Sequence, residues 1–294
     1  MTRVWIALLA ACGGAPERPA PRRADATHAQ LSLAADGRMV TIPAGQYIAG
    51  STPEERVSAY DDYFETAGQD AARELKWFEH EEDRHIGKLG VYRIDLMPVR
   101  QVEYAEFVAA GNVAGPTIDE AAWRAQGFRQ DFATQVTPYM WREGRPPSGH
   151  EDHPVVLVTQ TEAARYCAWR GELVGEKRRL PTAAEYEKAA RGETGFVYPW
   201  GNTYDSQKLN SAIRGPGGTT PAGSFSDGAS PFGVLELAGN VFQWTDTASG
   251  GGKILVKGSA WDDYAGVGRG ASGHGRVAGA RHVIVGFRCA ADAS

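Results

Sequence analysis

The sequence has no extended cluster of lysine and arginine and no long apolar run. Its 294 residues carry 31 Lys and Arg against 36 Asp and Glu, which gives a formal net charge of −5. Phosphate backbones are held by concentrated positive charge, so nucleic acid is not expected as a partner. The apolar run near the N-terminus covers residues 4–11 and is too short to span a bilayer. Cysteine is scarce as well, with three in the chain.

Aromatic residues and glycine are plentiful by comparison. Apolar residues make up 42% and aromatic residues 10% of the chain, with eight Trp, which is typical of a folded globular protein. The 36 Gly and 16 Pro indicate a loop-rich fold with short elements rather than a helical bundle. No further break in composition divides the chain, so we expect one domain over residues 33–294, and a monomer.

The first residues are typical of an export signal, with Arg3 followed by an apolar run and small residues. Residues 9–12 resemble a bacterial lipobox, so we expect a signal peptide over residues 1–11, lipidation of Cys12 and a flexible tether over residues 12–32. This predicts a lipoprotein of the bacterial cell envelope, attached to the outer membrane and facing the periplasm or the cell surface. A chance apolar N-terminus with an incidental cysteine is the alternative.

The other two cysteines are Cys167 and Cys289, separated by 122 positions. Export places them in an oxidising compartment, which favours a disulfide over a metal pair or a nucleophile. The chain-entropy model assigns a loop of this size about 5 kcal/mol. Two buried free thiols are the alternative.

Hydrophobic patterning predicts the first elements of the domain. Residues 39–49 are consistent with an opening hairpin, and residues 51–78 with an inserted helical excursion. Residues 91–96 predict a strand and residues 102–110 a helix. A long loop is expected over residues 112–150.

Capping boxes mark the next two helices. The apolar run at residues 154–158 predicts a strand buried on both sides, and Thr159 with Glu162 then forms a capping box for a helix that Gly171 should end. Thr182 and Glu185 repeat the box ahead of a helix over residues 183–191 that should end at Gly192.

A series of short motifs resembles, in order, those of formylglycine-generating enzymes. The resemblance covers roughly residues 39–292 and extends to the wider sulfatase-modifying-factor family, which includes sulfoxide-synthase domains and lectin-like receptors. The motifs are PVVLV at 154–158, YCAW at 166–169, RLPT at 179–182, EYE at 185–187, ARG at 190–192, YPWGN at 198–202, FG at 232–233, GNV at 239–241, WT at 244–245 and GFRCAAD at 286–292.

This resemblance implies an α+β fold that is loop-rich, has short helices and strands, and is related to the C-type lectin fold. It also implies a disulfide between Cys167 and Cys289, because the cysteines of the YC-x-W helix and the terminal GFRC strand are paired in the best-known member.

The chain departs from the family where copper binds. In formylglycine-generating enzymes two cysteines hold copper(I), which needs soft thiolates. The matching positions fall near Asp262 and Val267, and no cysteine lies between residues 168 and 288. A carboxylate and a valine cannot replace a thiolate pair, so we expect no copper site and assign no catalytic residue.

A different metal site is the alternative. An iron site of the sulfoxide-synthase type needs three clustered imidazoles, or two with a carboxylate. The candidate ligands are His80, His85, His150, His153, His274 and His282.

The resemblance also implies structural calcium. Asn240, with the carbonyls of Gly239 and Val241, matches the family's site in the GN-x-x-W motif, and oxygen ligands suit this hard cation. Asn210 aligns with a second site. The alternative interpretation is that Asn240 supports a left-handed turn before Val241.

The family holds an extended peptide or a small polar ligand in the groove beside its thiol segment. Aromatic residues among paired acids and bases have the composition of a recognition surface. The residues expected there are Trp261, Asp262, Asp263, Tyr264, Arg269, Arg276 and Arg281.

The sequence therefore predicts an exported lipoprotein with a formylglycine-generating-enzyme-like domain that lacks the copper cysteines. Its expected partners are the membrane, through the lipid anchor, and a peptide, glycan or envelope partner. The alternative is a protein-modifying oxidoreductase with a divergent metal site.

Overall fold

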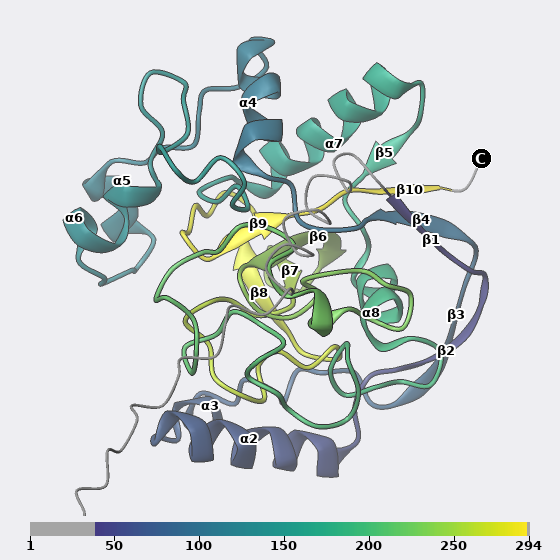
Figure 1. The fold of residues 1–294 in the computed structure, drawn as a ribbon. Coiled ribbons are helices and arrows are strands. Elements are labelled where there is room, and N and C mark those ends of the chain that lie inside the picture. The colour runs from purple at the N-terminus through teal and green to yellow at the C-terminus, as the bar shows by residue number, and fades with distance from the viewer. Residues whose placement is uncertain (1–38, 293–294) are drawn as a thin grey trace, which may run out of the picture.

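The computed structural model describes residues 39–292, in which short helices and strands are joined by long irregular segments (Figure 1). The predicted signal peptide (1–11), Cys12 and the tether (12–32) lie outside these residues. Within residues 39–292, no helix is both long enough and apolar enough to cross a bilayer.

Three small sheets carry the strands. The first has the order β1 (Met39–Ile42), β4 (Tyr92–Asp95), β10 (Ala290–Asp292) and β5 (Arg178–Arg179), all antiparallel. The second pairs β2 (Gly45–Ala49) with β3 (His85–Leu89). The third, at the centre of Figure 1, has the order β8 (Gly273–Val277), β7 (Lys253–Lys257), β6 (Phe242–Ala248) and β9 (Val285–Phe287), with β6 and β9 parallel.

The helices surround these sheets. They are α2 (Pro53–Ala67), α3 (Ala71–Glu74), α4 (Gln101–Ala109), α5 (Glu120–Ala125), α6 (Phe132–Gln135), α7 (Gln160–Val174) and α8 (Ala183–Arg191), with 3-10 turns η1 (Thr137–Tyr139) and η2 (Ser226–Gly228). The capping boxes predicted at Thr159 and Thr182 are confirmed at the starts of α7 and α8. Residues 112–150 are not one loop, because Asp119 and Asp131 cap the short helices α5 and α6.

The predicted opening hairpin is wrong. β1 pairs with β4 and β2 pairs with β3, so consecutive strands enter different sheets. The Pro-Ala-Gly turn between them redirects the chain, with Gly45 at a φ of 151°. Alternation of apolar residues indicates extended backbone but does not name the partner strand.

The predicted strand at residues 154–158 is also wrong, although its burial is confirmed. Val155 and Leu157 are fully buried. Leu157 has a φ of 60°, which no regular strand contains. The backbone N–H groups of Val155 and Leu157 donate instead to Val99 and His282 at 2.9 Å and 3.2 Å, so this segment is an irregular buried link between distant parts of the chain.

Gly171 does not end α7, which continues to Val174 and is capped by Gly175 in the left-handed conformation. A Cβ atom at Gly171 would lie 2.3 Å from the carbonyl oxygen of Glu176. The glycine therefore allows the chain to return closely past the helix toward β5.

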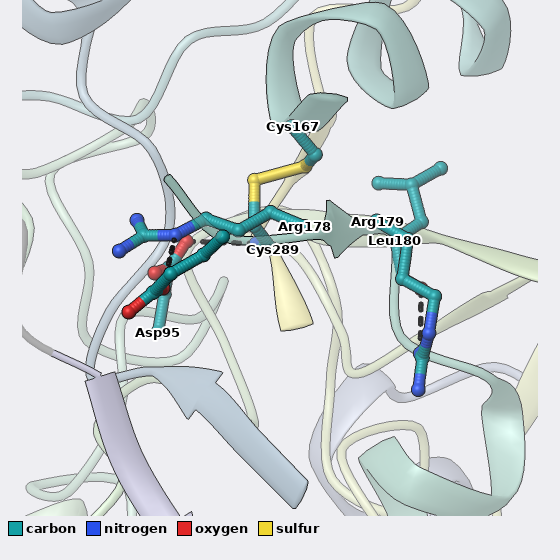
Figure 2. The surroundings of a disulfide bond; sticks show 7 residues. Asp95, Cys167, Arg178, Arg179, Leu180 and Cys289 are labelled. Carbon is teal, nitrogen blue, oxygen red and sulfur yellow. Dashed lines mark hydrogen bonds and ion pairs between the residues drawn. A yellow bond between two sulfur atoms is a disulfide. The ribbon is translucent and has the colours of Figure 1, made fainter. Parts of the chain in front are cut away.

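The predicted disulfide between Cys167 and Cys289 is confirmed (Figure 2). The Cα atoms of the two residues are 5.5 Å apart. The bond joins α7 to the segment between β9 and β10, and the backbone N–H of Cys289 donates to Asp95 at 2.8 Å. Burial raises the pKa of Asp95 to about 6.

The insertion at residues 51–78 is helical, as expected, and it packs on the segment that replaces the copper thiols. α2 lies along the lower edge of Figure 1. The backbone N–H of Ala265 donates to Thr66 at 3.2 Å, and the Tyr63 and Tyr264 rings meet edge to face at 5.7 Å. The insertion therefore forms part of the surroundings of residues 260–270.

Candidate functional site

A cavity of about 1370 Å³ opens beside the edge strand β8. One set of lining residues comes from the end of the insertion and the segment just after it (residues 75–77 and 80–82). Another comes from the end of β6 and the turn that follows it (residues 247–251). Phe128 and Gln130, ahead of α6, also line the cavity, as do Asp262 and Asp263. Elements far apart in sequence thus build one concave surface, the usual form of a small-molecule site.

Asp262 and Asp263 line this cavity. Both were predicted as groove residues, and both lie in the thiol-replacing segment, residues 260–270, which takes the place of the family's copper-binding cysteines. Asp263 Oδ2 accepts the backbone N–H of Ala260 at 2.7 Å, which fixes the turn that presents both carboxylates. Burial raises the pKa of Asp263 well above its ordinary value, and the adjacent Asp262 charge raises it further. Desolvation by the surrounding protein also raises the pKa of Asp262, which is more exposed than Asp263.

Arg276 and His274 enter the cavity from β8. Burial lowers the pKa of the Arg276 guanidinium, while the Asp263 and Asp262 charges act in the opposite direction. Burial, assisted by the Arg276 charge, lowers the pKa of His274 to about 4. His274 is therefore neutral near pH 7 while Arg276 keeps its charge.

Aromatic rings surround His274. Trp77 from the insertion and Phe242 from β6 meet its ring edge to face, at centroid distances of 5.9 Å and 5.3 Å. The cavity thus combines an aromatic surface with the Asp262 and Asp263 carboxylates and the Arg276 guanidinium. Its further charged lining residues are Glu81, Glu82, Glu187, Lys76, Lys253 and Lys257. Sequence reasoning missed Trp77, Phe242 and Gln130 as lining residues, and nothing in the local pattern sets them apart from core residues.

The other predicted groove residues lie elsewhere. Arg269 is buried and forms an ion pair with Glu81, and Tyr264 packs on α2. Arg281 donates to the Leu157 carbonyl at 2.7 Å, and Trp261 packs against the main core. The structure therefore brings together Asp262, Asp263 and Arg276, and none of these other four lines the cavity.

The positions that match the copper thiols do not fit copper(I). Val267 is fully buried in the main core, and Asp262 offers a hard carboxylate. Cys167 and Cys289 are oxidised to a disulfide and provide no thiolate. No step is therefore derived through copper.

Three of the six candidate histidine ligands, His80, His274 and His282, line the cavity, whereas His85, His150 and His153 do not. Within residues 39–292, no three side chains of His, Cys, Asp or Glu gather in a way that could hold a metal ion. His150 and His153 contact each other with ring centroids 4.5 Å apart, and His153 Nδ1 lies 2.9 Å from Thr219 Oγ1. Burial lowers the pKa of His282 to about 3, and this ring packs between Trp123 and Phe128.

Asn210 and Asn240 are both buried and adjacent. Asn240 has a φ of 66°, as the turn interpretation requires, and its Oδ1 accepts hydrogen bonds from Thr220 N and Asn210 Nδ2 at 3.0 Å and 3.1 Å. Asn210 Oδ1 is buried and has no hydrogen-bond partner among the described residues. Asn210 therefore fits a hard cation with an available oxygen, whereas Asn240 would have to exchange hydrogen bonds.

Glu236 lies beside Asn240. Its Oε2 accepts the Asn240 amide at 3.2 Å, and its Oε1 accepts the backbone N–H of Gly223 at 2.9 Å. Burial raises the pKa of Glu236 to about 7. Like Asn240, Glu236 would have to exchange hydrogen bonds before its oxygens could serve a cation.

Comparison with known proteins is consistent across sequence and fold. The family described as "Sulfatase-modifying factor enzyme 1-like domain" matches residues 26–293. The chain is 28% identical to "Inactive C-alpha-formylglycine-generating enzyme 2" of Mus musculus, over 90% of this chain and 89% of that protein. It is 31% identical to "Hercynine oxygenase" of Mycolicibacterium smegmatis, over 61% of this chain and 42% of that protein.

The solved structure of PvdO from Pseudomonas aeruginosa has a similar fold, with a TM-score of 0.64 and 22% identity over 87% of this chain and 94% of that one. This likeness concerns the fold alone. The family match covers most of the residues and agrees with the α+β fold and with the motifs identified in the sequence. The chain therefore belongs to the sulfatase-modifying-factor family, as a divergent member that resembles formylglycine-generating enzymes.

Proposed function

We propose that this protein is an exported lipoprotein whose sulfatase-modifying-factor domain binds a peptide, glycan or envelope partner without oxidising it through copper. The observation that carries the proposal is the chemistry of the thiol-replacing segment. It presents Asp262 and Asp263 to a cavity and buries Val267 in the core. Such a segment is suited to hold polar groups and has no soft ligand for copper(I).

The relatives are compatible with this assignment. One similar protein carries the word "inactive" in its name, and another is an oxygenase. The family scaffold thus occurs with and without oxidative chemistry, so activity must be argued from the side chains in the site.

The decisive experiment is an assay for aldehyde formation. The purified protein is incubated with a Cys-x-Pro-x-Arg peptide, copper(I) and oxygen, and the peptide is analysed by mass spectrometry. We expect no aldehyde, because no thiolate pair is present. The formylglycine-generating enzyme of Mycobacterium tuberculosis serves as the positive control. Aldehyde above the level without protein would overturn the proposal in favour of a divergent oxidoreductase.

The lipid anchor is the part of the proposal that concerns location. It rests on the lipobox-like residues 9–12 and would place the domain in the bacterial cell envelope. Mass spectrometry of the mature N-terminus should find an acylated Cys12, and Cys12→Ser should release the protein from the membrane fraction. An unprocessed N-terminus would contradict this part.

The proposal also includes a structural calcium ion. Asn210 and Asn240 would hold it through their side-chain oxygens, assisted by the carbonyls of Gly239 and Val241, and it would order the loops on which they lie. At a calcium concentration one hundred times Kd, binding stabilises the folded state by about 2.7 kcal/mol. Excess EGTA is expected to lower the melting temperature, and Asn210→Ala should abolish the EGTA effect. An unchanged melting temperature at saturating chelator would remove the site.

A further inference from the structure

Arg276 is a cavity-lining guanidinium without a direct partner. It is half-buried on β8, and no group of residues 39–292 forms a hydrogen bond or an ion pair with it. A guanidinium carries five N–H donors, and buried donors are normally satisfied by protein or ligand. The contrast with Arg269 is direct, since Arg269 makes hydrogen bonds to both carboxylate oxygens of Glu81.

Two further polar atoms in the same cavity are unsatisfied. His274 Nε2 and Gln130 Oε1 are buried, and neither has a hydrogen-bond partner among the described residues. These atoms come from β8 and from the segment between α5 and α6, so they converge from different elements. A buried polar atom without a partner is destabilising, and a bound polar ligand would satisfy it.

The carboxylates that oppose Arg276 do not touch it. Asp262 and Asp263 line the cavity, and their charges act on the pKa of Arg276, yet no ion pair joins either of them to the guanidinium. Asp263 uses Oδ2 for the Ala260 N–H, whereas its Oδ1 accepts no hydrogen bond from residues 39–292. An anion receptor and a cation receptor therefore line the same cavity without being joined in an ion pair.

We infer that the cavity binds its ligand through an α-amino-carboxylate group, with the carboxylate on Arg276 and the ammonium on Asp262 and Asp263. The aromatic surface of Trp77 and Phe242 takes the rest of the ligand. The inference rests on the proposed binding function and names its ligand class. A bidentate Arg–carboxylate pair supplies orientation, and the carboxylates reject ligands whose amine is blocked.

Two sources carry this chemistry in a cell envelope: free amino acids, and a larger molecule that ends in the same group, such as a cell-wall peptide with a diaminopimelate side chain. The cavity volume of about 1370 Å³ accommodates either. Both sources present the ammonium and the carboxylate on one carbon, so the receptor chemistry is the same.

The test is calorimetric titration of the full chain with two free probes, L-phenylalanine and a tripeptide that ends in meso-diaminopimelate. The blocked probes are N-acetyl-phenylalanine and phenylalaninamide. We expect at least one free probe to bind, and either block to weaken binding about tenfold or more, because a buried charge is then left unpaired. If only the tripeptide binds, the natural ligand is the larger molecule and not a free amino acid.

Matched variants separate recognition from general electrostatics. Arg276→Met should lower the affinity for the free probe about tenfold and remove the preference over the amide. Asp262→Asn should remove the preference over the acetylated probe. Lys88→Met is the control, because it removes a positive charge from an exposed side chain of β3 that does not line the cavity. It should leave the affinity unchanged, and thermal melting verifies that all variants fold.

The inference is overturned if free and blocked probes bind equally, if Arg276→Met keeps the preference, or if neither free probe binds at millimolar concentration. Each of these outcomes leaves the proposed copper-independent function in place. That function fails on the aldehyde assay instead, so the two failures are distinguishable.

Discussion

Reduction of the Cys167–Cys289 disulfide is expected to lower the free energy of unfolding by about 2–5 kcal/mol. The bond spans 122 positions, so it strongly restricts the unfolded chain, and it joins α7 to the segment between β9 and β10. Urea unfolding with and without dithiothreitol measures the change as a shift of the midpoint.

The Cys167→Ala/Cys289→Ala double variant is the control for this experiment. It should be destabilised like the reduced protein, and dithiothreitol should not affect it. If reduction left the midpoint of the parent protein unchanged, the restriction of the unfolded chain could not be a major source of stability.

Loss of the buried pair between Arg269 and Glu81 is expected to have a comparable effect. Their side chains are only 3% and 2% exposed. The Arg269 guanidinium also lies over the Phe78 ring, 4.8 Å from its centroid. Arg269→Met leaves the Glu81 charge buried and uncompensated, so we expect a loss of about 3–5 kcal/mol in the free energy of unfolding.

A double-mutant cycle tests this explanation. Arg269→Met/Glu81→Gln should be more stable than Arg269→Met alone, because no unpaired charge remains. Arg73→Met is the surface comparison, since its partner Asp61 is 61% exposed, and it should cost less than about 1 kcal/mol. Equal stability of the single and double variants would contradict the argument.

The ion pair between Arg269 and Glu81 also helps to position the cavity lining. Glu81 lies just after the insertion and Arg269 lies within the thiol-replacing segment, so their contact fixes the insertion against residues 260–270. Trp77, which lines the cavity, lies on the insertion side of this contact. Arg269→Met should therefore weaken ligand binding as well as folding.

Local signals in the sequence predicted local structure well. The capping boxes at Thr159 and Thr182 gave the starts of α7 and α8, because a hydroxyl and a carboxylate three residues apart satisfy the first N–H groups of a helix. The disulfide followed from cysteine scarcity and family motifs. Pairing of strands was not predictable, since β1 and β2 have partners more than thirty residues away.

The site was predictable only in part, for the same reason. The family motifs located Asp262 and Asp263 through the missing thiols. Trp77, Phe242 and Gln130 reach the cavity from three separate elements, and nothing in their own neighbourhoods marks them. Arg269 and Arg281 have the residue type expected of a ligand contact, yet tertiary packing commits them to Glu81 and Glu162.

The positions of β9 and β10 have a consequence for synthesis and export. β10 lies between β4 and β5, and β9 closes the other four-stranded sheet beside β6. Neither sheet is complete until residues 285–292 have left the ribosome, and pairing across such sequence distances is slow. Under the proposed export, a chain that completes its sheets this late would remain able to pass through a secretion channel, and its final packing and disulfide formation would follow on the far side.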